Sequence, residues 1–345
     1  MKLFLLLSQI MKDLIIVTGG AGFIGSNLVR KLNSEGIERI IIIDSLNKKW
    51  KWKNIRDLKF FDFINYEIGT EVLLKQIDTD KISKIFHIGA NSDVLFSDDN
   101  KMVQLNFEHS KFWLSISISK KIPFVFASSS AIYGNKLIKR KKSSDFNFPP
   151  HNIYAFSKMM FENHVNQLLK HSKGLPKIIG LRFFNTYGWG EFHKGKNASL
   201  VYRFFLFLKE DGKIKLFENA EKIKRSYISV SDNVKIIKEA MDKRIKSGIY
   251  DLGSENPISH KELAFTIIDI LKEEGFLDKK RSSESFIEYI PFPESLKNRF
   301  QFYTKADIPE WMKTIPVDSF KKGVKKYLKT LLQKETEEKI ANNYY

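Results

Sequence analysis

The feature that most constrains this chain is a glycine-rich turn between a short apolar strand and an amphipathic helix near its start. Residues 14–17 (LIIV) lead into TGGAGFIG at 18–25, a G-x-x-G-x-x-G spacing, and a helical pattern of apolar positions follows. Glycines at such a junction allow a tight turn, a close approach of the backbone to a pyrophosphate, and close packing of helix on strand. The helix N-terminus adds N–H donors and the positive end of its dipole. The turn therefore predicts an α/β fold that binds a dinucleotide.

Apolar strands and helical segments alternate through the first half of the chain. Each strand is a short, flat apolar run, of the kind that a parallel sheet buries on both faces. The segments between them are long enough for crossover helices, which are right-handed in such sheets. We expect strands at 14–17, 40–43, 85–88, 124–127 and 178–181, and helices at 23–33, 72–77, 102–119 and 154–170. The pattern predicts an α/β protein with a Rossmann-type, doubly wound parallel sheet.

The alternation breaks after about Gly188, where short strands, helices and turn signals mix. We therefore expect a smaller C-terminal α/β lobe that binds the substrate. The predicted division is an NAD(P)-binding Rossmann domain at 11–187, a lobe at 188–330 with some return to the sheet, and a frayed tail at 331–345. Met1 and Met11 are alternative starts of the chain.

Composition narrows the function classes. The 345 residues include no Cys, which excludes disulfides, thiolate metal sites and a Cys nucleophile, and suits a reducing cytoplasm. We expect no metal site. We also expect no membrane partner, because no run of 18 apolar residues, the length of a membrane-spanning helix, occurs. The 58 Lys+Arg against 40 Asp+Glu give a net charge of +18, but 48 of the basic residues are Lys, scattered rather than clustered. We interpret most of this charge as a solvated lysine surface and expect no nucleic-acid partner, although a phosphate-bearing substrate would also suit it.

A single acid follows the second predicted strand. Asp44 lies 19 residues after Gly25, where such folds place a carboxylate on the adenosine ribose. This acid alone favours NAD. Lysines follow at positions 48, 49, 51 and 53, and they could instead neutralise a 2′-phosphate. These residues leave NAD and NADP open.

A tyrosine and a lysine are spaced for chemistry at the edge of the sheet. Tyr154 and Lys158 lie four residues apart at the start of a predicted helix, so their side chains share one face. The pair follows strand 124–127 and its serines at 128–130, at the carboxyl edge where an open α/β sheet places its chemistry. A tyrosine hydroxyl has an ordinary pKa of about 10 and is a poor base at neutral pH. Lys158 and a cationic nicotinamide would lower that pKa, and Ser129 would bind the substrate oxygen that gains or loses the proton.

The same segments carry a family resemblance. Four blocks resemble those of the extended short-chain dehydrogenase/reductases that act on nucleotide sugars: TGGAGFIG (18–25), ASSSAIYG (127–134), YAFSK (154–158) and RFFNTYG (182–188). Four more specific blocks are similar to those of the ADP-L-glycero-D-manno-heptose 6-epimerases: FHKG (192–195), KLFE (215–218), KRSY (224–227) and IEYIPFP (287–293). The similarity runs from about residue 14 to 327, and dehydratases and 4-epimerases share the glycine turn but not the later blocks.

The resemblance implies an activity. It implies an NADP-assisted inversion at C6″ of an ADP-heptose, a step toward the inner-core heptose of lipopolysaccharide, in a cytoplasmic homo-oligomer. A hydride leaves C6″ and returns to it after the other face is presented, so no external reductant is consumed. Matched by motif, Tyr154 and Lys194 would be two acid/base residues, since inversion needs a proton carrier on each side of one carbon. Lys158 would support the cofactor and Tyr154, and Ser129 would orient the sugar.

The resemblance also implies which residues contact each small molecule. The positions expected at the cofactor are Gly19, Gly22, Phe23, Ile24, Gly25, Asp44, Ser45, Lys51, Gly89, Ala90, Lys158 and Thr186. Those expected at the substrate are Ser129, Asn185, Lys196, Arg203, Phe217, Glu218, Asn219, Ala220, Arg225 and Phe300. The family usually has Ser, His and Tyr at the positions of Lys196, Arg203 and Phe300, and an acidic residue at Ile88. We expect these departures to give tighter, more salt-sensitive diphosphate binding and altered recognition of the heptose.

Two alternatives remain open. A nucleotide-sugar 4-epimerase or 4,6-dehydratase is the first, although dehydratases place an acidic pair just after the serine strand and SAIY (130–133) has none. A catalytically retired Rossmann protein that binds RNA through its +18 charge is the second. Loss of the Tyr/Lys pair would mark such a protein, and the pair is present.

Overall fold

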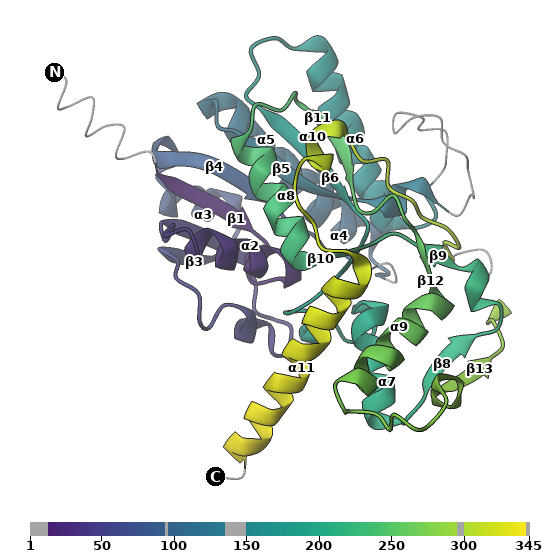
Figure 1. The fold of residues 1–345 in the computed structure, drawn as a ribbon. Coiled ribbons are helices and arrows are strands. Elements are labelled where there is room, and N and C mark those ends of the chain that lie inside the picture. Colours follow the sequence, from purple (N-terminus) through teal and green to yellow (C-terminus); the bar gives the residue numbers. More distant parts are fainter. Residues whose placement is uncertain (1–12, 94–95, 135–149, 295–299, 343–345) are drawn as a thin grey trace.

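A seven-stranded parallel sheet forms the centre of the protein (Figure 1). The computed structural model describes residues 13–93, 96–134, 150–294 and 300–342. The strand order is β11-β6-β5-β4-β1-β2-β3, and every neighbouring pair is parallel. The strands are β1 (Leu14–Thr18), β2 (Ile40–Asp44), β3 (Asp62–Asn65), β4 (Ile82–His87), β5 (Phe124–Ser129), β6 (Ile178–Phe183) and β11 (Gly248–Leu252). The order of the strands reverses between β1 and β4, which is the kind of crevice where such sheets bind ligands.

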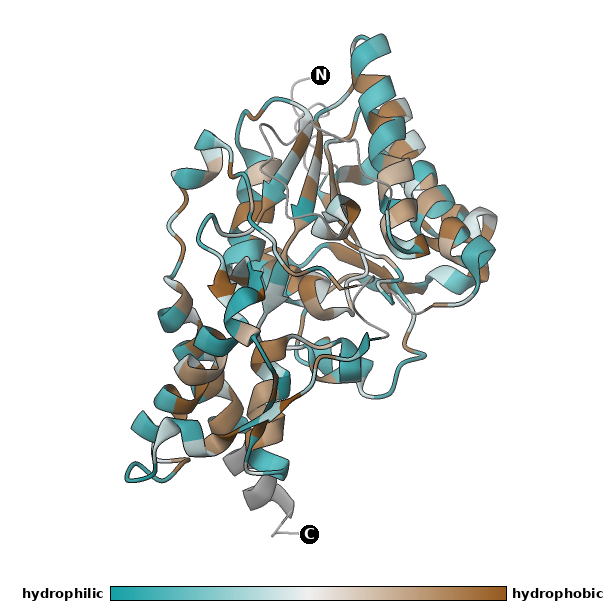
Figure 2. Ribbon diagram, turned by 90° about the vertical axis from the view of Figure 1, so that its right-hand side faces the viewer, coloured by the Kyte–Doolittle hydropathy of each residue, from teal (hydrophilic) through white to brown (hydrophobic). Residues whose placement is uncertain are grey.

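Helices cover both faces of this sheet. One face carries α2 (Phe23–Asn33) and α8 (Val230–Asp242), and the other carries α3 (Thr70–Gln76), α5 (His109–Lys120) and α6 (Ile153–His171). Alternate residues of β1 enter the two layers: Ile15 and Val17 join the first core, and Leu14 and Ile16 join the second. Figure 2 shows the apolar colour on the strands between these helices. The predicted Rossmann-type, doubly wound sheet is confirmed.

Two segments of the sheet region differ from the prediction. The helix expected at 102–119 is divided into α4 (Asp99–Val103), a π-helical turn at Gln104–Glu108, and α5. Strand β3 was not predicted, because this edge strand buries only Ile64 fully and shows little apolar patterning. Among the described helices, none combines the length and the apolar character needed to cross a bilayer.

A second lobe has a core of its own and lies beside the carboxyl end of the sheet (Figure 1). Its main elements are α7 (Leu200–Glu210), β8 (Ile214–Phe217), α9 (His260–Glu273), β13 (Ile287–Ile290) and α11 (Phe320–Asn342). Short strand pairs join it to the sheet region: β7 (Asn185–Tyr187) with β10 (Tyr227–Ser229), and β9 (Lys224–Arg225) with β12 (Ile258–Ser259). Between these elements the chain returns to the sheet as β11. The exact division at residue 188 stays a prediction.

The frayed tail expected at 331–345 stays a prediction, and the structure describes most of that range as helix. Helix α11 continues through Asn342, because Leu328 and Leu331 repeat the apolar spacing of the helix and are buried in the core of the lobe. Residues 343–345 and Met11 lie outside the described residues.

Candidate functional site

The glycine turn brings three backbone segments into very close approach. A Cβ at Gly25 would lie 2.1 Å from the Gly19 carbonyl oxygen, and a Cβ at Gly19 would lie 2.5 Å from Cα of Gly89. Gly19 also has φ +68°, which favours glycine. Gly22 is the N-cap of α2 and supplies no side-chain cap, so the N–H groups of the first turn stay open to an anion. This cradle fits the diphosphate of a dinucleotide.

Asp44 ends β2 beside the glycine turn and is only 5% exposed. One carboxylate oxygen accepts the Ala21 N–H at 2.9 Å, and the other accepts the Ser45 N–H at 2.8 Å. The Lys51 amine, from the 3-10 turn Lys51–Asn54, forms an ion pair with the same carboxylate. Asp44, Ser45 and Lys51, three of the predicted cofactor residues, therefore lie together.

Several lysines surround the imidazole of His193. Burial, together with the charges of Lys51, Lys194 and Lys48, lowers the pKa of His193 to about 4. Asn54 lies next to this ring, with its amide nitrogen 3.2 Å from Nδ1 of His193. His193 is therefore neutral, and the positive charge beside Asp44 resides on the lysines. Such a group suits an anion near the adenosine end of a dinucleotide.

Ser129 and Tyr154 meet at the carboxyl end of β5. Tyr154 lies in the first turn of α6, where Asn152 caps the helix by accepting the Ala155 N–H at 2.8 Å. Burial raises the pKa of Tyr154, and its hydrogen bond with Ser129 opposes that rise. The Tyr154 hydroxyl is accordingly a proton-bearing group in this structure. The lowered pKa that we expect for Tyr154 depends on a cationic nicotinamide together with Lys158, and it stays a prediction.

Lys158 lies one helical turn beyond Tyr154 and points into the protein. Its amine donates a hydrogen bond to the Ala127 carbonyl at 2.9 Å, two residues before Ser129. The pKa of Lys158 is lowered to about 8, because burial lowers it more than the carboxylate of Glu162 raises it. The described contacts thus fix Lys158 beside the serine strand rather than on the Tyr154 hydroxyl.

A buried ionic network lies beneath Lys158, and we did not predict it. Arg182 donates to both carboxylate oxygens of Glu162 (2.9 and 2.8 Å), and lies 3.5 Å from Asp251. Tyr133 bridges the two sides, since its hydroxyl accepts from Arg182 and donates to Asp251, each at 2.5 Å. Ser128 donates to Glu162. Charged residues inside the otherwise apolar strands IIGLRF and GIYDL were the available signal.

A second unpredicted set of polar residues supports the crevice between β1 and β4. The Thr18 hydroxyl lies 2.8 Å from His87 Nδ1, and His87 Nε2 lies 2.8 Å from the Ser110 hydroxyl. Because Ser110 donates to the Asn106 carbonyl, the imidazole donates from Nε2 and accepts from Thr18 at Nδ1. Burial lowers the pKa of His87 well below its ordinary value, which keeps the ring neutral. The chain of bonds holds Thr18, whose oxygen accepts the Gly89 N–H at 3.1 Å.

Asn106, in the π-helical turn, links this crevice to α6. Its amide donates to the Asn91 carbonyl and to the Ser157 hydroxyl, at 2.9 and 3.0 Å, and its oxygen accepts the Asn91 N–H. Ser157 in turn donates to the Tyr154 carbonyl. Nothing in the sequence around Asn106 distinguishes it from a surface asparagine on a helix.

Lys194 lies on the cofactor side of the site. Its amine is 5.4 Å from the centre of the Phe23 ring, at the start of α2. Burial lowers the pKa of Lys194, with Glu191 opposing and Lys48 adding to the effect. Asn27 holds the preceding segment by donating to the Trp189 carbonyl at 2.7 Å. Among the described residues, no hydrogen bond or ion pair joins Lys194 to Tyr154.

Arg225 lies together with two other predicted substrate residues, Phe217 and Phe300. Its guanidinium lies 5.1 Å from the centre of the Phe300 ring and donates to Gln301 at 2.9 Å. Burial lowers the pKa of Arg225 to about 10. Phe217, at the end of β8, has its ring centre 6.4 Å from that of Phe300. Arg225, Phe217 and Phe300 therefore form one cluster of cation and aromatic rings.

The other predicted residues lie around these groups. Lys196 is exposed, and Arg203 packs over Phe207 of its own helix at 5.7 Å, with its pKa lowered by burial. Neither contacts the Arg225 cluster among the described interactions. Thr186 accepts from Asn233 at 2.7 Å, and Asn185 donates to the Ser226 carbonyl. Of the remaining residues, Ile24 lies in α2, Ala90 follows β4, and Glu218, Asn219 and Ala220 follow β8.

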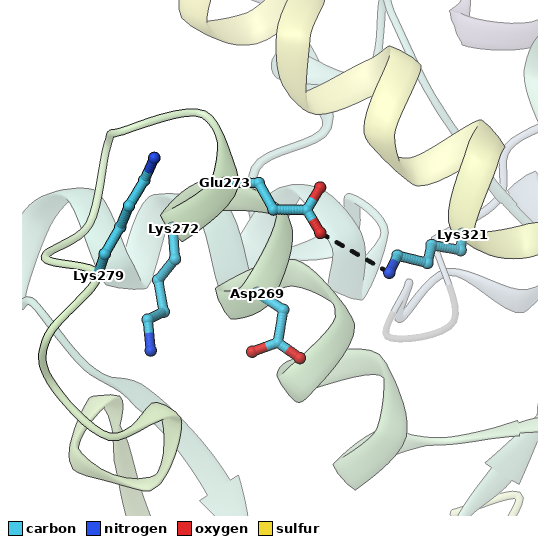
Figure 3. Close-up of a pocket in the computed structure, with 5 residues that line it drawn as sticks. All are labelled: Asp269, Lys272, Glu273, Lys279 and Lys321. Atoms are coloured by element: carbon cyan, nitrogen blue, oxygen red, sulfur yellow. Dashed lines mark ion pairs between the residues drawn. The ribbon is translucent and has the colours of Figure 1, made fainter.

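A surface hollow lies away from all of these residues, between α9, the loop after it and α11 (Figure 3). Its lining residues are Asp269, Lys272, Glu273, Lys279 and Lys321. Glu273 faces Lys321 at 3.8 Å, as Figure 3 shows, and pairs with Lys325 at 2.7 Å. Acids and lysines thus neutralise one another there, and we do not assign the hollow to the candidate site.

Comparisons with known proteins agree with this arrangement. The model of the NAD dependent epimerase/dehydratase family matches residues 15–253. The ADP-L-glycero-D-manno-heptose-6-epimerase of Brachyspira hyodysenteriae is 37% identical over 322 residues, which cover 92% of this chain and 98% of that protein. The crystal structure of the Helicobacter pylori ADP-L-glycero-D-manno-heptose-6-epimerase is 28% identical with a TM-score of 0.74, covering 93% and 96% of the two chains.

A more distant structure shares the fold. The UDP-N-acetylglucosamine 4-epimerase from Methanobrevibacter ruminantium is 22% identical with a TM-score of 0.77, covering 94% of this chain and 99% of that one. The family model and the 37% identical relative together extend over nearly all of the described protein. The chain therefore belongs to the NAD dependent epimerase/dehydratase family, and within that family it is similar to the ADP-L-glycero-D-manno-heptose-6-epimerases.

Proposed function

We propose that the protein inverts the configuration at C6″ of an ADP-heptose by transient oxidation and hydride return. The observation that carries the proposal is the pairing of Tyr154 with Ser129 at the end of β5, with the Lys158 amine bound two residues earlier on the same strand. The glycine turn opens at the same edge of the sheet. The similarity to ADP-heptose epimerases over 92% of the chain supports the substrate.

In the proposed mechanism, a bound nicotinamide dinucleotide supplies the hydride acceptor and donor. Tyr154 keeps a proton on its hydroxyl, since burial raises its pKa, and Ser129 orients the substrate oxygen toward it. Lys194 has a lowered pKa and accepts or returns a proton more readily than an ordinary lysine. Two proton carriers on separate segments serve the two epimers, whose hydroxyls lie on opposite sides of one carbon.

The proposed cofactor is NADP. Lys51 neutralises Asp44, the acid that would otherwise repel a 2′-phosphate, and Lys48 and Lys194 add positive charge around the neutral His193. Denaturing the purified protein and identifying the released dinucleotide by mass spectrometry tests this assignment. We expect NADP from the parent, and a shift toward NAD in Lys51→Met. Recovery of NAD alone from the parent would contradict the proposal.

The proposed contacts of the substrate follow from the lobe. Arg225 would bind the diphosphate, with the aromatic rings of Phe217 and Phe300 beside it. Lys196 and Arg203 would add charge at the rim. The role in lipopolysaccharide heptose synthesis, the cytoplasmic location and the homo-oligomeric state stay predictions.

The decisive experiment follows one substrate through turnover. We expect the parent to epimerise ADP-heptose without added NADPH and to retain deuterium placed at C6″. Tyr154→Phe and Lys194→Met should each abolish turnover while keeping the fold and the bound dinucleotide. Tyr289→Phe and Lys170→Met, at exposed positions, serve as matched controls. An active double variant, or complete exchange of the label with solvent, would overturn the mechanism.

A further inference from the structure

Gln301 lies on a segment that is held in register with the strand bearing Arg225. The Lys224 N–H donates to the Phe302 carbonyl at 2.9 Å, and the Thr304 N–H donates to the Lys224 carbonyl at 3.0 Å. The Thr304 hydroxyl also accepts the Ser226 N–H at 2.9 Å. These backbone bonds fix the position of Gln301 beside Arg225.

Both ends of the Gln301 carboxamide have partners. The oxygen accepts from the Arg225 guanidinium at 2.9 Å. The nitrogen donates to the Gly134 carbonyl at 2.9 Å and to the Ser130 carbonyl at 3.3 Å. These two carbonyls belong to the turn that directly follows Ser129. A single side chain therefore joins the arginine of the lobe to the serine turn of the sheet.

We infer that Gln301 is a positioning residue that orients Arg225 for the substrate diphosphate without neutralising it, and that ties this arginine to the turn carrying Ser129. The inference rests on the proposed function, because it takes Arg225 as a diphosphate ligand. Among the described residues no carboxylate forms an ion pair with Arg225, and its hydrogen-bond acceptor is a neutral amide. A neutral acceptor holds the guanidinium in place while its charge remains available to a phosphate.

A carboxylate at this position would behave differently. Glutamate has nearly the shape of glutamine, but it would pair with Arg225 and repel a diphosphate. It would also place an acceptor against the carbonyl oxygens of Ser130 and Gly134. Methionine would keep the volume and leave the arginine charged, but it would remove both sets of hydrogen bonds.

The test measures ADP binding by calorimetry and epimerisation by kinetics, using the full chain with its bound dinucleotide. We expect Gln301→Glu to raise the Kd for ADP by about tenfold or more in a variant that remains folded. We expect Gln301→Met to raise the Kd by only about threefold, because Arg225 loses its orienting hydrogen bond but keeps its charge available. We expect the same variant to lower kcat by about tenfold, because the serine turn loses its link. Gln76→Glu, an exposed glutamine on α3, adds the same charge elsewhere and should change neither quantity.

The outcomes separate this inference from the proposed function. Equal ADP binding by the parent and Gln301→Glu, or equal losses of binding in Gln301→Glu and Gln301→Met, would overturn the role of Gln301 while leaving epimerisation by the parent intact. A parent that binds no ADP would overturn the diphosphate role of Arg225 and the inference with it. The expected pattern of ADP binding in a parent that does not epimerise ADP-heptose would support Gln301 and overturn the proposed substrate.

Discussion

Arg182 in the sheet region and Arg225 in the lobe are both shielded from water, but the groups that surround the two cations differ. Arg182, in the sheet, faces Glu162 at 2.8 Å and Asp251 at 3.5 Å, and these acids raise its pKa. Arg225, in the lobe, meets a neutral amide and an aromatic ring, and burial lowers its pKa to about 10. A compensated charge belongs to the structure, whereas an uncompensated one is available to a ligand.

The largest effect that we expect is on stability. Arg182→Met leaves Glu162 and Asp251 as buried charges without their common cation. Breaking a buried ion pair from one side costs about 3–5 kcal/mol of folding free energy. Urea unfolding of the purified variant measures this loss.

A control variant at Arg30 shows whether the cost of losing an arginine comes from the burial of its ion pair or from the geometry of its hydrogen bonds. Arg30 also binds a carboxylate through two hydrogen bonds, to Asp57 at 2.6 and 3.0 Å, but its side chain is 40% exposed. We expect Arg30→Met to cost less than about 1 kcal/mol. If Arg182→Met lowered the free energy of unfolding no more than Arg30→Met, the ionic network would have no structural role. The contrast between Arg182 and Arg225 would then be wrong.

The next effect is on ligand binding. Arg225→Met should weaken ADP binding by about 1.5–3 kcal/mol, the usual value of hydrogen bonds to a charged group, and should change the free energy of unfolding by less than about 1 kcal/mol. Calorimetry and urea unfolding on the same samples give both numbers. Arg244→Met removes a charge from an exposed position and controls for net charge. A variant that loses stability but binds ADP normally would reverse our assignment of the two arginines.

A smaller effect concerns pH and depends on Lys158, whose neighbour Glu162 pairs with Arg182. The Lys158 pKa is about 8, so its ammonium is present below that pH and lost above it, and kcat should fall as pH rises through about 8. The charged groups around Lys158 are Glu162, on its own helix, and Arg182 behind that carboxylate, while His87 from β4 is neutral. Glu162→Gln removes the charge that raises this pKa, so the alkaline fall should move to lower pH.

Two further variants make the pH measurement specific. Lys158→Arg keeps its charge at high pH, so whatever activity remains should lack the fall near pH 8. Glu108→Gln, an exposed acid paired with Lys111 at 3.1 Å, should leave the profile unchanged. The same alkaline fall in Lys158→Arg would assign it to another group.

The smallest expected effect lies at the rim of the lobe. Lys196 is exposed, and the Arg203 side chain packs over Phe207 of the same helix. Each should therefore interact with a diphosphate only through solvent. Lys196→Ser with Arg203→His should change kcat/KM by less than about threefold at physiological salt, with a weaker dependence on salt. Equal salt dependence of variant and parent would show that these two departures from the family pattern do not affect binding.

The sequence correctly predicted those elements whose local residue pattern matches the way they pack in the folded protein. Apolar runs such as IIIID in β2 are buried on both faces, and the G-x-x-G-x-x-G turn takes the close-packed form that its spacing requires. The last helix, α11, was not predicted, because lysines and glutamates dominate the composition of its second half. The buried Leu328 and Leu331 reveal the helix only when they are considered with the lobe that they pack against.

The site was predictable where motifs are local and not where it depends on distant partners. Tyr154 and Lys158 are one helical turn apart, so sequence spacing places them together. The link between Arg182 and Asp251 joins residues 69 positions apart, and that between Tyr133 and Asp251 spans 118. The raised pKa of Tyr154 likewise depends on how deeply the fold buries its ring, which no short motif records.

The return of β11 to the sheet has a consequence for the order in which the protein can be completed during synthesis. The chain leaves the ribosome from its N-terminus, so β6 is made well before β11, which lies directly beside it with Asp251 opposite Arg182. Until residue 252 has emerged, β6 is an open edge with unsatisfied backbone groups. Asp251 in turn accepts the Asp307 N–H at 3.0 Å, from a segment made later still. The sheet is therefore finished only after α7 and β8 of the lobe have been made, whereas α9, β13 and α11 of the lobe follow the last strand of the sheet.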